Sequence, residues 1–436
     1  MVFVVPKANA QQIDSTENER FSIHGQMTLI NQFKTPFTAN YSGTNSLSTQ
    51  QDNERSFTTT FFLGARLWKG ASVFINPEIA AGSGLSQAMG VGAATNGETF
   101  RIGSPAPQLY LARLFYKQVF NLTDKLKPRE TQFFHHHSDF NQLASTEPIQ
   151  YFSFTIGKIG IADYFDDNTF SHDPRTQFMS WALMDNGAWD YPANTRGYTP
   201  SVVLEYVTPR HEIRYGISLM PQKANGNDMN WDLSKSASHT LEYTRKFEIN
   251  HQKGAIRLLG FYTTTQMGNY RQSIALKPVQ PVIEETRKYG NTKYGFGLNA
   301  EQNLTKDLGC FFRASWNDGI NETWAFTEID HSIRGGFVLT GQAWKRENDN
   351  IGLAYVASGL SDAHRAYLKA GGKGFMLGDG YLNYAWEHLM ELYYSAALLK
   401  NHLFVTGTYQ MLVNPGYNLD RGGPVNIFSI RLHARI

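Results

Sequence analysis

The chain of 436 residues has little of several things that common protein classes need. Its one cysteine, Cys310, excludes an internal disulfide and a metal site built from several thiolates. No apolar run approaches the ~18 residues that a transmembrane helix needs. Charged residues make up 18% of the chain, and the 40 Lys and Arg residues nearly balance the 38 Asp and Glu residues. That balance gives no argument for a nucleic-acid partner.

The chain also has no convincing helix-period segment and no repeat of the solenoid or propeller type. What it has instead is alternation of apolar and polar residues with a period of two. In HLFVTGTYQMLV (402–413), Leu403 and Tyr409 share one face, while Thr406 and Thr408 share the other. Such alternation predicts strands that are apolar on one face and wet on the other.

About sixteen segments alternate in this way, and we expect each to form a strand. They span 21–33, 55–68, 71–81, 108–120, 151–162, 200–207, 211–220, 238–249, 254–266, 291–304, 309–318, 333–345, 351–358, 383–398, 402–413 and 424–436. Connections after even-numbered strands are tight, whereas those after odd-numbered strands are mostly long. This parity predicts an all-β fold, a transmembrane antiparallel up-and-down β-barrel with short periplasmic turns and long extracellular or inward loops.

One connection, 121–150, is long where a turn is expected, which indicates either two further strands or a periplasmic excursion. A soluble sandwich or propeller would also alternate, but its strands are usually near five or six residues long. Aromatic residues near strand ends fit the interface girdle of a barrel instead. They are Trp68, Trp316, Trp344 and Tyr409. We therefore predict one barrel domain over residues 21–436.

The first residues, MVFVVPKANAQQ, place small residues at Ala8 and Ala10 as a secretory cleavage site does. We interpret 1–10 as a truncated signal-peptide remnant; the alternative is an ordinary frayed terminus. An exported barrel is expected in the outer membrane of a Gram-negative bacterium. Outer-membrane lipid and lipopolysaccharide would then surround it.

Charges within the strands are expected to point into the lumen, because a charge that faces lipid at mid-membrane costs a few kcal/mol. Arg66 and Glu78 fit this expectation, as do Glu387 and Glu391. The face of Arg113 also carries Leu111 and Phe115, which weakens the same assignment there.

The segment 163–199 is unusually rich in aromatic and charged residues for a loop. A sixteen-stranded pore is too wide to discriminate among small solutes unless a segment folds into it, and 163–199 is the candidate constriction loop. Sugars offer hydroxyl groups at the ring edge and C–H groups on the faces, so they need hydrogen-bonding groups and an aromatic platform. The loop supplies both as Asp173, Arg175, Asp185, Trp189 and Asp190. The alternative is that these residues tie the loop to itself and to the wall.

Two stretches carry a family resemblance. GKIGIADYFDDNTFSHDPRTQFMSWALMDNGAWDYPANTRGY (157–198) and the C-terminal run that begins YLNYAWEHLMELYY (381–436) resemble the carbohydrate-selective porins, the OprB-like family. The resemblance implies a sixteen-stranded barrel that passes sugars passively and has no cofactor. It also implies a constriction of inward loops and charged wall residues. By position the wall residues would be Arg66, Glu78, Arg113, Glu387 and Glu391, while Asp185, Trp189 and Asp190 fall within the loop motif.

The chain departs from the family at its end, Ile436, where an aromatic residue is common, and in 82–107 and 133–139, which do not match. The three adjacent histidines of 135–137 cannot all converge on one metal ion. Glu387 and Glu391 could mimic a glycosidase pair, but charged barrel wall is the better interpretation, so we expect no enzyme. No apolar stripe demands a trimer, so a monomer is expected and a trimer is not excluded.

An alternative function is a structural or enzymatic role in a larger surface complex. Packing of 82–107, 121–150 or 359–382 across the lumen would favour that role, whereas a wide polar lumen favours sugar diffusion.

Overall fold

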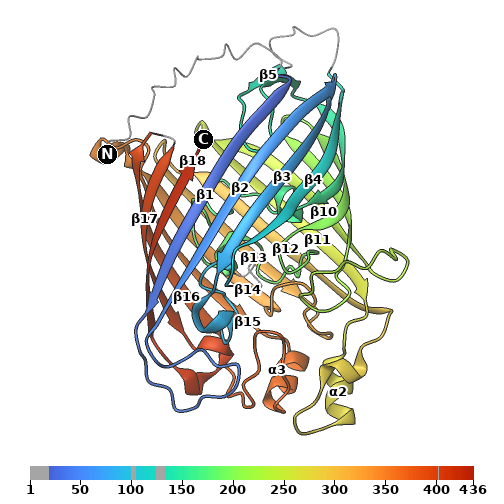
Figure 1. The fold of residues 1–436 in the computed structure, drawn as a ribbon, viewed down its shortest axis with the longest axis vertical. Coiled ribbons are helices and arrows are strands. Elements are labelled where there is room, and N and C mark those ends of the chain that lie inside the picture. The colour runs from blue at the N-terminus through green and yellow to red at the C-terminus, as the bar shows by residue number, and fades with distance from the viewer. Residues whose placement is uncertain (1–18, 100–104, 124–132, 401) are drawn as a thin grey trace.

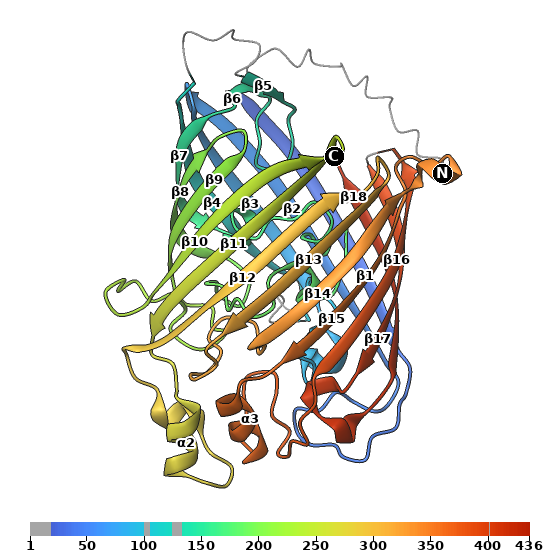
Figure 2. The same cartoon turned by 180° about the vertical axis from the view of Figure 1, so that it is seen from behind.

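Sixteen strands close into one antiparallel barrel in the computed structural model, which describes residues 19–99, 105–123, 133–400 and 402–436 (Figures 1 and 2). The barrel strands are β1 (Phe21–Lys34), β2 (Asp52–Trp68), β3 (Ala71–Gly82), β4 (Gln108–Asn121), β7 (Tyr151–Ile159), β8 (Thr199–Val207), β9 (His211–Leu219), β10 (Ala237–Ile249), β11 (Gln252–Thr265), β12 (Asn291–Asn303), β13 (Leu308–Asn317), β14 (His331–Thr340), β15 (Asn350–Gly359), β16 (Glu387–Leu399), β17 (Leu403–Val413) and β18 (Val425–Arg435). Each pairs with its neighbours in order, and β1 closes the sheet against β18. The predicted fold class is confirmed.

The short connections and the C-terminus lie at one end of the barrel, here called the turn end (top in Figure 1). The long connections lie at the other, the loop end, with the helices α2 (Tyr270–Leu276) and α3 (Asp362–Lys369). The helix α1 (Trp181–Met184) and short 3-10 segments complete the described elements. The 3-10 segments are Leu85–Ala88, Ile161–Asp163, Ile283–Thr286, Gly341–Trp344, Pro415–Tyr417 and Leu419–Arg421. In the described part of the chain, no helix has the length and apolar character needed to cross a membrane.

Alternation places apolar side chains outside the barrel and polar ones inside. On β18, Phe428 is 48% exposed and Ile430 is 64% exposed, whereas Ser429 and Arg431, which alternate with them, are buried. Because strand side chains alternate faces, this follows from the sequence pattern alone. The sequence predicts that Glu78, Glu387 and Glu391 point inward. In the structure these residues are at most 1% exposed.

A β-bulge settles the direction of Arg113. The partners of Asn76 and Pro77 on β4 are Arg113 and Leu111, so Ala112 is left without a partner. Proline has no N–H to donate to the ladder, which explains why the pairing is interrupted here. The extra residue turns Leu111 outward, 38% exposed, and Arg113 inward, 8% exposed.

The sequence left open whether the connection 121–150, after the fourth strand, holds two further strands or an excursion, and it holds both. Two further strands, β5 (Phe133–His136) and β6 (Ser145–Pro148), pair with each other and not with the barrel. They stand at the turn end, above β4 in Figure 1. The excursion therefore contains a small hairpin that is not part of the barrel sheet. The predicted signal-peptide remnant, 1–10, lies outside the described residues.

Two strand predictions were too long. The segment 333–345 ends as a strand at Thr340, and Gly341 N–H bonds to the Asp349 carbonyl at 2.8 Å, so a compact turn replaces the strand end. The segment 383–398 starts as a strand only at Glu387, because Tyr384 forms an isolated bridge with Asn418.

Candidate functional site

The inward loop, residues 160–198, fills part of the lumen as a packed body. Its Phe165, Trp181, Trp189 and Tyr191 lie in one buried apolar cluster with wall residues such as Phe261. Trp181 stacks on Tyr191 with ring centroids 5.7 Å apart. The predicted position of this segment inside the barrel matches its packing, and its role as the constriction stays a prediction.

Asp166 is the polar centre of the inward loop. Its carboxylate accepts hydrogen bonds from the backbone N–H of Asn186 at 2.5 Å and from the Asn299 side chain of β12 at 2.6 Å. It also pairs with Arg313 of β13, with 3.2 Å between Nε and Oδ1, and neither side chain is exposed. One carboxylate thus joins two parts of the loop to two strands.

Carboxylates on the wall hold the loop by its backbone. Glu391 accepts the N–H groups of Met179 and Ser180 at 2.6 and 2.9 Å. Glu301 accepts the N–H of Thr169 at 2.6 Å. An ionised acceptor makes a stronger hydrogen bond than a neutral one, and a buried N–H without a partner is costly. These glutamates therefore act as anchors for the loop.

The connection between β3 and β4, residues 83–107, is held in the same way in its described part. Glu387 accepts the N–H groups of Gly92 and Ala93 at 3.1 and 2.6 Å, and that of Gly416 at 2.8 Å. The carbonyl of Ala93 in turn accepts the N–H of Ala182 in α1. The described part of 83–107 and the inward loop therefore pack against each other inside the barrel.

Three of the predicted residues meet on the β3–β4 wall. Arg175 of the inward loop lies 3.2 Å from Glu78, measured from Nη2 to Oε2, and its Nε donates to Glu98. The Arg113 guanidinium lies over the Tyr198 ring at 5.0 Å and donates two hydrogen bonds of 2.6 Å to Asp163. Arginine forks and carboxylates of this kind suit sugar hydroxyl groups, but here they already bind each other.

The other predicted residues lie apart. Arg66 is near the turn end and donates to the carbonyls of Glu19 and Ala144. The carboxylate of Asp190 accepts three consecutive backbone N–H groups, from Trp324 to Phe326, at 2.7 to 3.0 Å. Asp173 accepts the N–H of Arg175 at 3.0 Å.

Asp185 faces His172, with 3.5 Å between Oδ1 and Nδ1. Burial alone would lower the pKa of His172, but the carboxylates of Asp185 and Asp167 raise it to about 9. The imidazole is then charged at neutral pH. Trp189 is 1% exposed and packs on Phe165 and Tyr191. The direct contact of the ten predicted residues with sugar stays a prediction.

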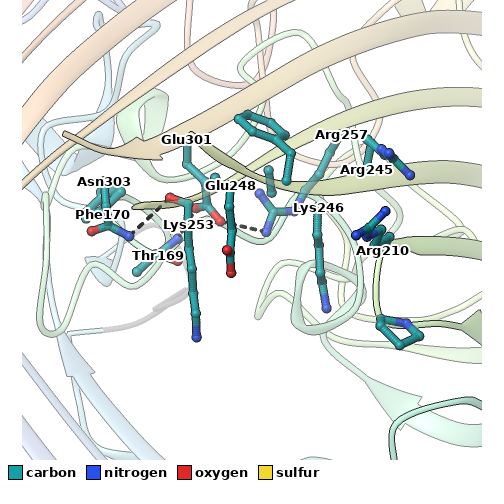
Figure 3. Close-up of a pocket in the computed structure, with 14 residues that line it drawn as sticks. Thr169, Phe170, Arg210, Arg245, Lys246, Glu248, Lys253, Arg257, Glu301 and Asn303 are labelled. Atoms are coloured by element: carbon teal, nitrogen blue, oxygen red, sulfur yellow. Dashed lines mark hydrogen bonds and ion pairs between the residues drawn. The ribbon is translucent and has the colours of Figure 1, made fainter. Parts of the chain in front are cut away.

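A cavity of about 870 Å³ opens between the inward loop and the turn-end halves of β10, β11 and β12 (Figure 3). We call it the vestibule. Thr169 and Phe170 cover it from the loop, and the wall contributes Arg257, Glu301 and Asn303. It combines the side chains of Phe170 and Phe247 with charged and amide side chains in a space large enough for a small ligand.

Phe170 sits in the vestibule by close packing. Its ring lies where a Cβ on Gly309 of β13 would be, so only glycine leaves room for it. Arg257 is 5% exposed and donates from Nη2 to Glu301 at 3.1 Å. Its Nε and Nη1 have no hydrogen-bond partner among the described residues. Two nitrogens of this guanidinium at the vestibule wall are therefore buried without an acceptor, and a ligand reaches them when the Arg257 side chain turns towards the cavity.

Sequence reasoning missed these vestibule residues. Arg257 and Glu301 alternate with outward residues on β11 and β12, so the rule that strand charges point inward would have found them. Nothing in the sequence shows that Phe170, among the aromatic residues of the loop, is the one at the cavity.

A short stretch of the excursion, residues 138–144, covers the turn end beside β1, β2 and β18; we call it the mouth segment. Phe140 stacks on Phe62 of β2 with ring centroids 4.3 Å apart. The Arg435 guanidinium lies 4.6 Å from the centroid of the Phe140 ring. Asp139 pairs with Arg435 at 2.6 Å. The mouth segment narrows this side of the opening, while the vestibule lies on the β10–β12 side.

Replacing Phe140 by alanine is expected to increase single-channel conductance, because the mouth segment loses the ring that holds it against Phe62. The matched control is Phe134→Ala, whose ring is 37% exposed on β5. Planar-bilayer recordings of both variants measure the effect. Native conductance in Phe140→Ala would show that the mouth segment does not limit the current.

The three histidines of 135–137 lie on and beside this hairpin. His135 bonds to Thr146 at 3.0 Å, and His136 lies 3.5 Å from Glu147. No group of three or more possible metal ligands occurs in the part of the chain that the structure describes.

A closed sixteen-stranded barrel with an apolar outside, a charged inside and loops folded into the lumen defines an outer-membrane porin. A family model described as "Carbohydrate-selective porin, OprB family" matches residues 44–435. The chain therefore belongs to the OprB family of carbohydrate-selective porins. It is a channel of the bacterial outer membrane for passive diffusion of carbohydrates. In the general plan of such barrels, the end with the short turns faces the periplasm.

Solved structures of porins are similar in fold. The high-pH structure of Pseudomonas putida OprB has a TM-score of 0.71 at 16% identity, over 96% of this chain and 94% of that chain. The outer-membrane channel DcaP of Acinetobacter baumannii has a TM-score of 0.51 at 10% identity, over 95% and 97%. A search of curated protein sequences finds no match.

Packing of loop segments across the lumen would have favoured a structural or enzymatic role, and such packing is partly present. The described parts of 83–107 and of the excursion do pack in the lumen or at its mouth. The chain nevertheless belongs to a family of porins, and the vestibule forms a cavity on the β10–β12 side.

Proposed function

We propose that sugars cross the barrel along its β10–β12 side and pause in the vestibule, with Phe170 as the aromatic platform. The single observation that carries this proposal is the vestibule itself, which combines an aromatic face with charged groups in a cavity of about 870 Å³. The C–H face of a sugar ring packs on an aromatic ring. Its hydroxyl groups then reach Arg257 and Glu301.

The unused donors of Arg257 support this assignment. A buried guanidinium N–H without a partner is unfavourable, and a sugar hydroxyl can accept from it. Glu301 binds Thr169 with one oxygen and Arg257 with the other, so it holds both the loop and the donor in position. The site is thus built before the sugar arrives.

The ten residues predicted from sequence have a different part in this proposal. Carboxylates such as Glu387, Glu391 and Asp190 anchor the loops that shape the narrow region, and the cluster of Glu78, Arg113 and Arg175 fixes the inward loop to the β3–β4 wall. We further infer that the chain passes sugars without chemical change, acts as a monomer, and is surrounded by lipid and lipopolysaccharide.

The test is single-channel conductance of the refolded protein in a planar bilayer, titrated with glucose and maltose. Both sugars should block the current with saturation, while an uncharged non-sugar of similar size should not. Phe170→Ala should weaken the block about twofold to twelvefold, the range for loss of about 0.5–1.5 kcal/mol of aromatic contact.

Trp231→Ala serves as the control, because this tryptophan is 75% exposed and belongs to a connection at the opposite end of the barrel. Sugar block that is identical in Phe170→Ala and the native protein would overturn the vestibule as the sugar site. A well-folded barrel that conducts no current would favour a structural or enzymatic role.

A further inference from the structure

The vestibule has a strong excess of positive charge. Five of its lining residues are cationic, and only two, Glu248 and Glu301, are carboxylates. A channel for neutral sugars alone has no need of this excess. From it we infer that the vestibule binds sugars that carry one anionic group, a carboxylate or a phosphate, in preference to neutral sugars. This inference rests on the proposed function, because it names the substrate class of the same site.

The five cationic side chains differ in whether they already make an ion pair or a hydrogen bond with another side chain. Lys246 pairs with Glu212, and Arg245 bonds to His211, so both charges are partly satisfied. Arg210 and Lys253 are exposed on the wall of the cavity. They stand at its periplasmic rim, one before β9 and one at the start of β11. Figure 3 shows Lys253, Lys246 and Arg210 extending towards the open space below the strands.

Arg257 lies deeper and is the better-defined contact. It is nine-tenths buried, yet two of its nitrogens, Nε and Nη1, have no hydrogen-bond partner among the described residues. A planar guanidinium binds a carboxylate or a phosphate through two parallel hydrogen bonds. An anionic group at this position would satisfy the unused donors, which a single neutral hydroxyl does only in part.

The rest of the cavity favours a sugar over a bare anion. Phe170 covers the same space with an apolar ring, and Asn303 adds an amide at its edge. A cavity of about 870 Å³ lies within the range that holds small organic ligands. The rim cations Arg210 and Lys253 attract the anion, Arg257 binds it, and Phe170 receives the ring.

The experiment compares block of the single-channel current by glucose, glucuronate, glucose 6-phosphate and acetate, each added from the periplasmic side. Glucuronate or glucose 6-phosphate is expected to bind about threefold to tenfold more tightly than glucose at 0.1 M salt. The difference should shrink at 1 M salt, where the screening length falls from about 10 Å to about 3 Å and the attraction of the exposed rim cations is lost, while the contribution of the buried Arg257 remains. Which of the two anionic sugars binds more tightly tells carboxylate from phosphate.

Substitutions assign the preference to the vestibule. Arg257→Gln and Lys253→Gln should each reduce the ratio of glucuronate affinity to glucose affinity, and Glu248→Gln should raise it. Lys69→Gln is the matched control, because Lys69 is an exposed cation in the turn between β2 and β3. A heat-dependent shift in gel mobility confirms that each variant has folded as a barrel.

Failure of the anionic preference and failure of the proposed function would give different results. If glucose blocks and depends on Phe170, but glucuronate and glucose 6-phosphate bind no more tightly, the anionic preference is wrong and the vestibule remains a sugar site. If acetate binds as tightly as glucuronate, the vestibule is a plain anion site and this inference is overturned. If no sugar blocks the current, the proposed function itself fails.

Discussion

The Asp166→Ala variant is expected to unfold at a lower temperature than the native barrel and to conduct a larger, noisier current. Its carboxylate is the only acidic group paired with Arg313 among the described ion pairs, and it also binds Asn186 and Asn299. Removal of one partner of a buried ion pair costs about 3–5 kcal/mol, because the other charge is left without compensation. The inward loop would then detach from β12 and β13.

Asp167→Ala is the matched control. This neighbouring carboxylate is 61% exposed and lies 3.7 Å from Arg257, so its loss should change stability far less. Thermal unfolding followed by gel mobility, together with conductance recordings, measures both effects. Equal stability of the two variants would mean that Asp166 does not hold the loop in place.

Trp189→Ala is expected to destabilise the protein more than it weakens sugar binding. The indole is buried between Phe165 and Tyr191, and truncation of a buried aromatic side chain costs about 3–5 kcal/mol. Trp189→Phe keeps most of the packing and should be much milder. This pair separates a packed residue from the sugar platform that the sequence motif suggests.

The measurements for Trp189 are thermal unfolding and the glucose affinity of the channels that fold. Native stability combined with loss of sugar block would contradict the packed interpretation and return Trp189 to the list of sugar contacts. Lower stability with a nearly native glucose affinity would support it.

Most of the strands could be predicted from the sequence, because a strand with one face in lipid and one in the lumen must alternate. The prediction for 211–220 differs from β9 by one residue. The direction of Arg113 could not be settled, since the bulge at Ala112 shifts the alternation and depends on the pairing of two strands. The end at Thr340 was missed because Gly341 and Asp349 close the turn with a backbone hydrogen bond, which the alternation pattern does not show.

The site was predictable only in part. Alternation identified Glu391 as a residue that faces the lumen, but no pattern showed that it binds the backbone of Met179 and Ser180. Such contacts join residues far apart in the chain, so they appear only once the loop is placed. The same holds for Phe170, whose position depends on Gly309 of another strand.

The anchoring of loops through their backbone has a consequence for how such a channel can change. Glu391 and Glu387 bind peptide N–H groups, which every residue except proline has, so the anchoring hydrogen bonds do not depend on the side chains at Met179, Ser180 and Ala93. Gly92 is an exception, because a Cβ there would collide with Tyr417. Mutations in the loops can therefore alter the solute preference while the loop stays in place. The loops inside the lumen can therefore evolve, or be redesigned, while the strands of the barrel wall stay unchanged.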